Sequence, residues 1–269
     1  VINDFVTSLG GGTTVTIDEV TGEEVVSANS SVDVEHVQYD AVSYSSLRKA
    51  NNESFGKNVI PDYNFAKAKV IVAIDADFLA NWLMPTKFNI DYTETRKPEN
   101  GWMSKHYHFD SVFSLTGANA DVRTPIKPSE QGLVAAAILK EVTGKDLGLS
   151  IPENIKAIAH KIGKDLKAAK GESLVVAGEN NKAIQVIVNA INNALGNYGK
   201  TIDLDNPLNL KQADDAKVEA LVKEVEAGKI DALLMYGVNP VYTLPNGQKF
   251  GEAISKIDLS VSFSEYRDE

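Results

Sequence analysis

The chain has 269 residues, 43% hydrophobic and 24% charged, which is the composition of a globular protein of one or two domains with a full core. Its 27 basic and 37 acidic residues give a formal net charge of −10, which argues against nucleic-acid binding because phosphate contacts need clustered Lys and Arg. The absence of cysteine excludes disulfides, thiol nucleophiles and iron–sulfur ligation by these residues, and no apolar run approaches the roughly 20 residues of a membrane span.

The N-terminal part, residues 1–33, is rich in Gly, Thr and Ser and is expected to form a β-hairpin around Thr21–Gly22 or a mobile insertion. The chain begins Val1–Asn3, without an initiator Met or a signal peptide, and stops at Glu269 directly after a strand-like run. We therefore expect it to be a fragment of a longer protein.

Strand and helix patterns alternate from Val34 onward. The β-branched run from Ala68 to Asp75 is typical of a strand buried on both faces. A helix is predicted over 129–144, with Ser129 as its N-cap. In this half the other predicted elements are strands over 34–39 and 107–113, helices over 43–56 and 152–171, a helical turn over 77–83, and a long loop within 103–128.

The second half repeats the alternation. A strand over 174–177 leads through Gly178 into a helix that runs to about Leu195. Helices over 214–231 and 247–257 then alternate with strands over 232–240 and 259–264. Such alternation indicates right-handed crossovers and parallel sheets. The predicted fold is α/β, with two Rossmann-like three-layer units of mainly parallel strands, residues 1–148 and 149–269, joined near 144–150.

Three loops follow predicted strands and are candidate ligand loops, because open parallel sheets bind ligands beyond the carboxyl ends of their strands. They are Asp75–Asp77, Gly178–Asn181 and Gly237–Pro240. Each precedes a helix whose free N–H groups could receive an anion. None matches a dinucleotide or P-loop fingerprint, so tight-turn geometry is the favoured interpretation and a phosphate site the alternative.

Two pairs of side chains could carry chemistry. Asp75 and Asp77 could serve a metal or acid–base catalysis, but the favoured interpretation is that one caps the following helix and the other faces solvent. His106 and His108 are expected on one face of a strand. No third ligand stands at metal-site spacing, so an ordinary exposed pair is favoured. No Ser-His-acid pattern is visible, and we predict neither catalytic nor metal residues.

Four blocks of sequence together resemble a known family. In chain order they are YDAVSYSSLRKANNESFG, IPDYNFAKAKVIVAIDADFLANWL, FSLTGANADVRTPIKPSEQGLVAAAIL and LLMYGVNPVYTLPNGQKFGEAISKIDLSVSFSEYRDE. They resemble consecutive parts of the molybdopterin-oxidoreductase-like B subunit of alternative complex III, a bacterial quinol-oxidising membrane complex of the complex iron–sulfur molybdoenzyme superfamily. The resemblance runs from about Val34 to Glu269.

The resemblance implies a role for the GVNP loop. Catalytic members of the superfamily hold the guanosine ends of a bis-molybdopterin guanine dinucleotide with G-x-N-P and P-G-T-D loops. Gly237, Asn239 and Pro240 match the first form and would bind cofactor if a molybdopterin guanine dinucleotide is present. Physically, Gly237 allows close backbone approach, Asn239 offers a donor and an acceptor, and Pro240 stiffens the exit.

Two other loops depart from the family pattern. Asp75 and Asp77 stand where a catalytic member has Gly-x-Asn, and a carboxylate repels a pyrophosphate. Residues 128–131 read PSEQ where P-G-T-D is expected. These departures favour a region without cofactor.

The resemblance therefore implies a non-catalytic scaffold region of an electron-transfer subunit. Its partners would be other subunits of a membrane-bound respiratory complex and the missing remainder of its own chain, on the periplasmic side of the bacterial inner membrane. Iron–sulfur clusters would lie elsewhere in the full-length subunit. The alternatives are cofactor domains of an active molybdopterin oxidoreductase, of polysulfide or thiosulfate reductase type, and a small nucleotide-binding module.

Overall fold

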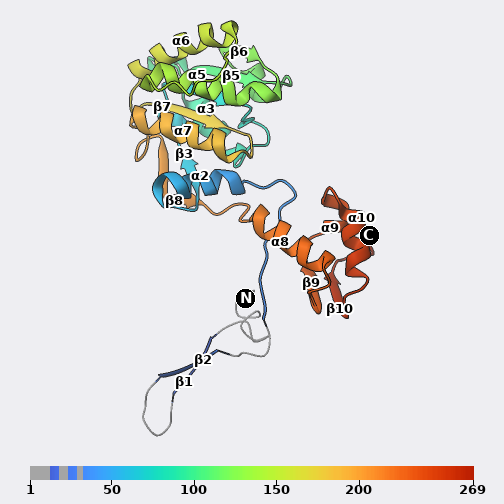
Figure 1. The fold of residues 1–269 in the computed structure, drawn as a ribbon. Coiled ribbons are helices and arrows are strands. Elements are labelled where there is room, and N and C mark those ends of the chain that lie inside the picture. Colours follow the sequence, from blue (N-terminus) through green and yellow to red (C-terminus); the bar gives the residue numbers. More distant parts are fainter. Residues whose placement is uncertain (1–12, 18–23, 29–32) are drawn as a thin grey trace. The chain divides into compact units, whose positions relative to one another are not determined.

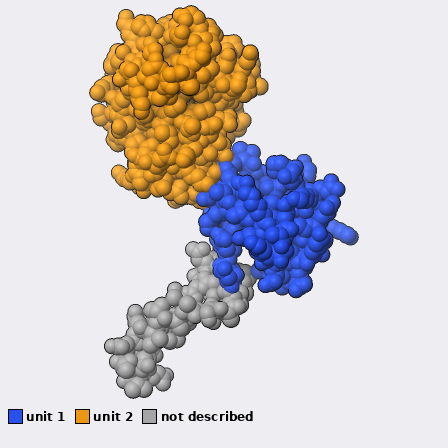
Figure 2. All heavy atoms as spheres, in the orientation of Figure 1, with its two compact units in different colours: residues 1–43, 213–269 blue, residues 44–212 orange. Residues whose placement is uncertain are grey.

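The computed structural model describes residues 13–17, 24–28 and 33–269, which form an α/β protein with Rossmann-like layers. The chain divides into two compact units, shown in different colours in Figure 2. The larger unit consists of residues 44–212, and the smaller consists of residues 1–43 and 213–269.

The larger unit is built on a four-stranded parallel sheet, of which β5, β6 and β7 are labelled in Figure 1. The strand order is β6-β5-β4-β7. The chain runs outward from β4 through β5 to β6 and then returns to the other side of β4 for β7. The carboxyl ends of β4 and β7 thus form the topological switch point, where open α/β sheets commonly bind ligands. The strands are β4 (Val70–Ile74), β5 (Lys105–Asp110), β6 (Val122–Pro125) and β7 (Ser173–Ala177).

Helices cover both faces of this sheet. All five residues of β4 are buried, and they alternate between two hydrophobic cores. Val72 and its in-phase neighbours face α5, α6 and α7, while Ile71 and Ala73 face α2 and α3. Burial on both faces explains why β4 reads as a continuous apolar run. The helices of this unit are α2 (Ser45–Phe55), α3 (Pro85–Glu94), α4 (Leu115–Ala118), α5 (Gln131–Thr143), α6 (Glu153–Ala168) and α7 (Lys182–Leu195).

The boundary between units differs from the sequence-based one. The predicted junction near 144–150 lies between α5 and α6, inside the larger unit. These two helices belong to one crossover and pack into the same core. After this crossover β7 pairs with β4, residue Leu174 lying beside Ile71. Residues on either side of the predicted boundary therefore share one sheet. The chain passes from one unit to the other between residues 43 and 44 and between residues 212 and 213.

The smaller unit contains a two-stranded parallel sheet of β9 (Ala232–Tyr236) and β10 (Leu259–Phe263). Its helices are α8 (Asp215–Glu226), α9 (Pro240–Thr243) and α10 (Gly247–Ile254). Leu233, Val225 and Phe250 form the centre of its core. In its N-terminal part β1 (Thr13–Ile17) pairs antiparallel with β2 (Glu24–Ala28), while Thr21–Gly22 lies outside the described residues.

Several sequence-based elements are corrected. Residues 34–39 form no strand, since no described strand pairs with them, and the segment makes side-chain contacts instead. Tyr39 donates to the hydroxyl of Thr243 at 2.7 Å. Ser129 does not cap a helix but lies in a 3₁₀ turn over Pro128–Glu130. The Glu130 carboxylate accepts from the Lys127 N–H at 2.8 Å, and α5 begins one residue later.

The patterns also missed short elements. Strand β5 begins at Lys105 and ends at Asp110, three residues before the predicted end. Strand β6, the helices α3 and α4, and an antiparallel pair of β3 (Ile60–Tyr63) with β8 (Ile202–Leu208) were not predicted. Three 3₁₀ turns complete the unit, over Phe65–Lys67, Pro98–Asn100 and Pro128–Glu130. The strands β3 and β6 have only four residues each, which gives too few positions for a periodic signal.

Side-chain amides close the outer edge of β7. The buried side chain of Asn192 on α7 accepts from the Val175 N–H at 3.1 Å and donates to the Val175 carbonyl at 2.7 Å. Asn197 in turn donates to Asn192 at 2.8 Å. Backbone groups buried without a partner are costly, so Asn192 takes the place of a neighbouring strand.

Asn192→Leu is expected to lower the free energy of unfolding by roughly 2–4 kcal/mol, because it leaves both polar groups of Val175 buried and unpaired. Urea denaturation followed by circular dichroism would measure this loss. The neighbouring Asn193 is exposed, so Asn193→Leu should change stability by no more than about 0.5 kcal/mol. Equal losses in the two variants would contradict the edge-closing role.

Candidate functional site

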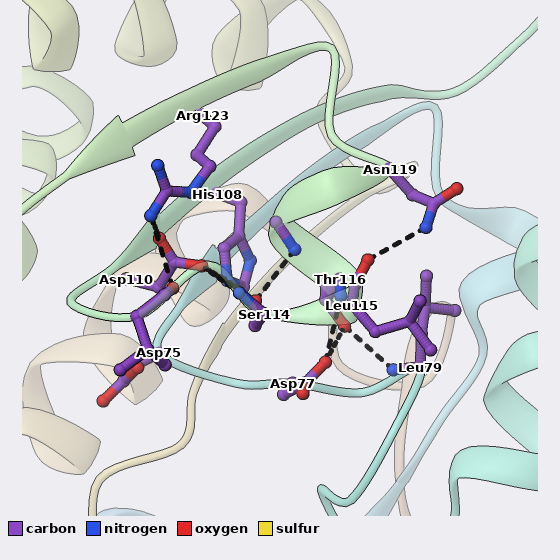
Figure 3. Close-up of polar contacts among 12 residues, drawn as sticks. Asp75, Asp77, Leu79, His108, Asp110, Ser114, Leu115, Thr116, Asn119 and Arg123 are labelled. Atoms are coloured by element: carbon purple, nitrogen blue, oxygen red, sulfur yellow. Dashed lines mark hydrogen bonds and ion pairs between the residues drawn. The ribbon is translucent and has the colours of Figure 1, made fainter.

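Polar side chains gather at the carboxyl ends of β4 and β5 in the larger unit (Figure 3). Three of them are carboxylates, Asp75 and Asp77 after β4 and Asp110 at the end of β5. His108, Ser114, Thr116 and Arg123 lie among them. This is the edge at which the sequence predicts ligand loops.

Asp110 is the centre of a buried polar cluster. Its carboxylate is fully buried and forms an ion pair with Arg123 at 2.7 Å. The Ser114 hydroxyl donates to the other carboxylate oxygen at 2.8 Å, and His108 Nε2 lies 3.3 Å from that same oxygen. Burial lowers the pKa of His108 despite the nearby carboxylates, so the neutral imidazole is favoured at neutral pH. A Cβ on Gly117 would lie 2.4 Å from Asp110 Oδ2, so only glycine fits there.

This cluster brings together a serine, a histidine and an aspartate without forming a nucleophilic triad. In a triad the acid binds the imidazole nitrogen that the serine does not use. Here Ser114 and Asp110 both approach Nε2 of His108, at 3.2 and 3.3 Å. Ser114 also accepts from the Gly117 N–H at 2.9 Å as the N-cap of α4. Its position is explained by helix capping.

The two histidines of β5 share one face, as the spacing predicts, and their ring centroids are 5.7 Å apart. They are not exposed, however. His106 and His108 are 0% and 1% exposed, and Phe78 and Tyr92 pack against the His106 ring with centroid distances of 5.3 and 5.5 Å. Burial, with a smaller contribution from His108, lowers the pKa of His106 to about 3, and Tyr92 contacts its Nδ1 at 3.2 Å. Within the described ranges no group of three or more His, Asp or Glu side chains could hold a metal ion.

Asp75 and Asp77 both bind protein groups. Asp77 accepts from the N–H and the hydroxyl of Thr116, at 3.0 and 2.6 Å, so it caps α4 and not the turn that follows it in sequence. Asp75 accepts from Gln131 at 2.7 Å and has a left-handed backbone with φ of 52°. Burial raises the pKa of Asp75, and the charges of Asp110 and Asp77 raise it further.

The switch point between β4 and β7 is closed by backbone contact. The Gly178 N–H donates to the Ile74 carbonyl at 2.9 Å and so continues the β4–β7 ladder by one residue. A Cβ on Gly178 would lie only 2.0 Å from the Asp75 carbonyl oxygen, so the loops after the two strands touch. Asn181 caps α7 by accepting from the N–H groups of Ala183 and Ile184. The first polar groups of both loops are therefore used within the protein.

The GVNP loop of the smaller unit has the turn that its sequence predicts. Gly237 has a φ of +66°, which favours glycine, and Pro240 is the first residue of α9. The Asn239 side chain accepts from the Tyr242 N–H at 3.1 Å and donates to Glu269 at 2.7 Å. Asn239 thus acts as a helix cap, and both ends of its amide contact the protein.

Comparison with known proteins does not identify this α/β chain. No family model matches it, and no curated protein matches it. In the part of the chain that the structure describes, no helix has the length and apolarity to cross a membrane.

Gly178→Ala is expected to destabilise the protein by roughly 3 kcal/mol, because the added methyl group would overlap the Asp75 carbonyl. The control Gly132→Ala lies in α5, where the nearest atom is 3.8 Å away, and it should be neutral or stabilising by up to about 1 kcal/mol. Thermal and urea denaturation of both variants would measure the difference. A Gly178→Ala protein as stable as the control would show that the two loops separate easily.

Asp75→Asn is expected to stabilise the protein at neutral pH. Because the folded state raises the pKa of Asp75, its ionised form is penalised only in the fold, and stability falls as pH rises from 3.8 through the folded value. Asparagine carries no charge and can still accept from Gln131. The stability difference between the two proteins, from urea denaturation across pH, should shrink as the pH falls below that window. A difference that is independent of pH would contradict the role of charge.

Proposed function

We propose that this chain is a scaffold region, without a redox cofactor of its own, of a molybdopterin-oxidoreductase-like electron-transfer subunit. The main support is the closed switch point, where Gly178 and the Asp75 carbonyl meet at the position that ligand-binding α/β sheets leave open. The ordered sequence blocks that resemble the B subunit of alternative complex III give the proposal its context. On this proposal the chain would belong to a quinol-oxidising respiratory complex.

The polar groups at the strand ends also support this proposal. Asp75, Asp77 and Asp110 bring three carboxylates to the edge of the sheet, and Arg123 is paired with Asp110. An anionic pyrophosphate would be repelled there unless a cation intervened. A molybdopterin guanine dinucleotide therefore does not fit this edge.

The GVNP loop favours neither alternative function. The Asn239 side chain accepts from the Tyr242 N–H and donates to Glu269, which leaves one amide hydrogen and one lone pair of the oxygen for a guanine. The active-oxidoreductase alternative and the nucleotide-module alternative would both use these remaining positions. On the scaffold proposal the loop keeps its helix-capping role.

In the proposed setting the chain contacts neighbouring subunits and the rest of its own polypeptide on the periplasmic side of the inner membrane. Iron–sulfur clusters would be carried by another region of that polypeptide, since this chain supplies no cysteine. Its contribution would be to hold those parts in place.

The full-length subunit purified from its native membrane provides the test. Molybdenum and tungsten measured by mass spectrometry, and pterin measured by fluorescence after oxidation, should both be far below one per subunit in a complex that still oxidises quinol. Stoichiometric metal together with pterin would overturn the scaffold proposal in favour of the oxidoreductase alternative. A rise in the melting temperature of this chain with saturating guanine or adenine nucleotide would support the nucleotide module instead.

Asn239→Ala tests the loop directly. It should lower the stability of the smaller unit by about 1 kcal/mol through loss of the α9 cap, and leave pterin content and quinol turnover per assembled complex unchanged. Asn246→Ala is the matched control, since the side chain of Asn246 makes no cap hydrogen bond at α10. Loss of turnover with Asn239→Ala alone would indicate a bound cofactor.

A further inference from the structure

The smaller unit leaves one face of its sheet exposed. Side chains alternate along β9, so that Leu233 and Met235 enter the core with α8 and α10. The side chains of Ala232, Leu234 and Tyr236 point to the opposite face. The residues paired with them on β10 point the same way. The large apolar side chains on this second face are exposed, Leu234 by 41%, Tyr236 by 76%, Leu259 by 54% and Phe263 by 57%.

We call this surface the β9–β10 face: Ala232, Leu234, Tyr236, Leu259, Val261 and Phe263. All six residues are apolar or aromatic, and the rings of Tyr236 and Phe263 lie 6.4 Å apart. Figure 1 shows α9 and α10 on one side of the two strands. Parallel sheets are normally covered on both faces, and large exposed apolar patches mark interaction sites.

The size of the face fits one helix. Five residues along each strand span about 16 Å, and the strands lie about 5 Å apart. A helix is about 10 Å in diameter and rises 1.5 Å per residue, so roughly 11 residues would cover the length of the face. An amphipathic helix with an apolar stripe supplies the layer that a Rossmann-like unit has on its second face.

The net charge of the smaller unit indicates the sign of the charged side chains that such a helix would carry. Residues 213–269 contain eleven Asp and Glu against six Lys and Arg. At the strand ends, acidic residues outnumber basic ones: Asp231, Asp258, Glu265, Asp268 and Glu269 against Lys229, Lys256 and Arg267. A second copy of this chain would bring like charges together, whereas a helix with basic flanks would be attracted.

We propose that the β9–β10 face binds a basic amphipathic helix of a neighbouring subunit. The proposal rests on the proposed scaffold function only for the location of that partner. The apolar stripe of this helix packs on Leu234, Tyr236, Leu259 and Phe263. The Lys and Arg residues on either side of the stripe contact the acidic residues at the ends of the strands.

A designed peptide provides the first test. The probe is a fluorescently labelled peptide of about 14 residues, with Leu at helical spacing and Lys on its flanks. Fluorescence anisotropy should show binding to the chain that weakens with added salt, and a peptide with Glu in place of Lys should bind at least tenfold more weakly. The double variant Leu234→Ser/Phe263→Ser should also bind at least tenfold more weakly.

The matched control removes exposed apolar side chains elsewhere. Val112 and Phe113 in the larger unit are 67% and 75% exposed, and Val112→Ser/Phe113→Ser should leave peptide binding unchanged. Circular dichroism of each variant checks that it folds. Equal binding by both double variants, no binding by the parent chain, or equal binding of the Lys and Glu peptides would overturn the proposal.

Thiol labelling locates the natural occupant, because peptide mass spectrometry distinguishes a cysteine placed on the β9–β10 face from any cysteine elsewhere in the full-length subunit. Leu234→Cys should react with a maleimide in the isolated full-length subunit and at least tenfold more slowly in the assembled complex, as read by peptide mass spectrometry. Protection already present in the isolated monomeric subunit would mean that its own chain covers the face, and protection that accompanies dimerisation would mean that a second copy does. Either result overturns the proposal, whereas the metal and pterin measurements test the scaffold function separately.

Discussion

The burial of β4 on both faces is the constraint on which the larger unit depends. All residues of β4 are buried, and successive side chains point to opposite faces of the sheet, so each face needs a hydrophobic core. The helices α5–α7 form the core on one face, and α2 and α3 form it on the other. Strand β4 also has β5 and β7 on its two sides and fixes the edge at which their loops meet. The carboxylates, the buried histidines and the switch point all take their positions from this central strand.

Polar groups at that edge are positioned by protein contacts. Asp77 caps α4, Asp110 pairs with Arg123, and Asp75 accepts from Gln131. Buried charges are stable only when paired or hydrogen-bonded, so these contacts explain why carboxylates are tolerated beside the core. The same contacts occupy the groups that a ligand would need. Carboxylates that suggest a reactive site in the sequence can therefore have a purely structural role.

The two units differ in how completely helices cover the faces of their sheets. In the larger unit helices cover both faces of the sheet, and Asn192 closes the outer edge of β7. In the smaller unit helices pack on one face of β9, and the other face of β9 and β10 presents aromatic and aliphatic side chains. A protein that holds other subunits together would need such a surface. This contrast connects the proposed scaffold role with the proposed docking face.

The sequence by itself determined the α/β class, the buried strand β4 and the regular β7–α7 unit, because continuous apolar runs and helical periodicity are local signals. It also indicated a tight turn at Gly237 and the shared face of His106 and His108. Only the tertiary structure decided that those histidines are buried, that Asp77 caps α4, and that β7 joins β4 across the predicted boundary. Each of these depends on which distant segments become neighbours, and that is set by how the strands pair and the helices pack, which no local pattern encodes.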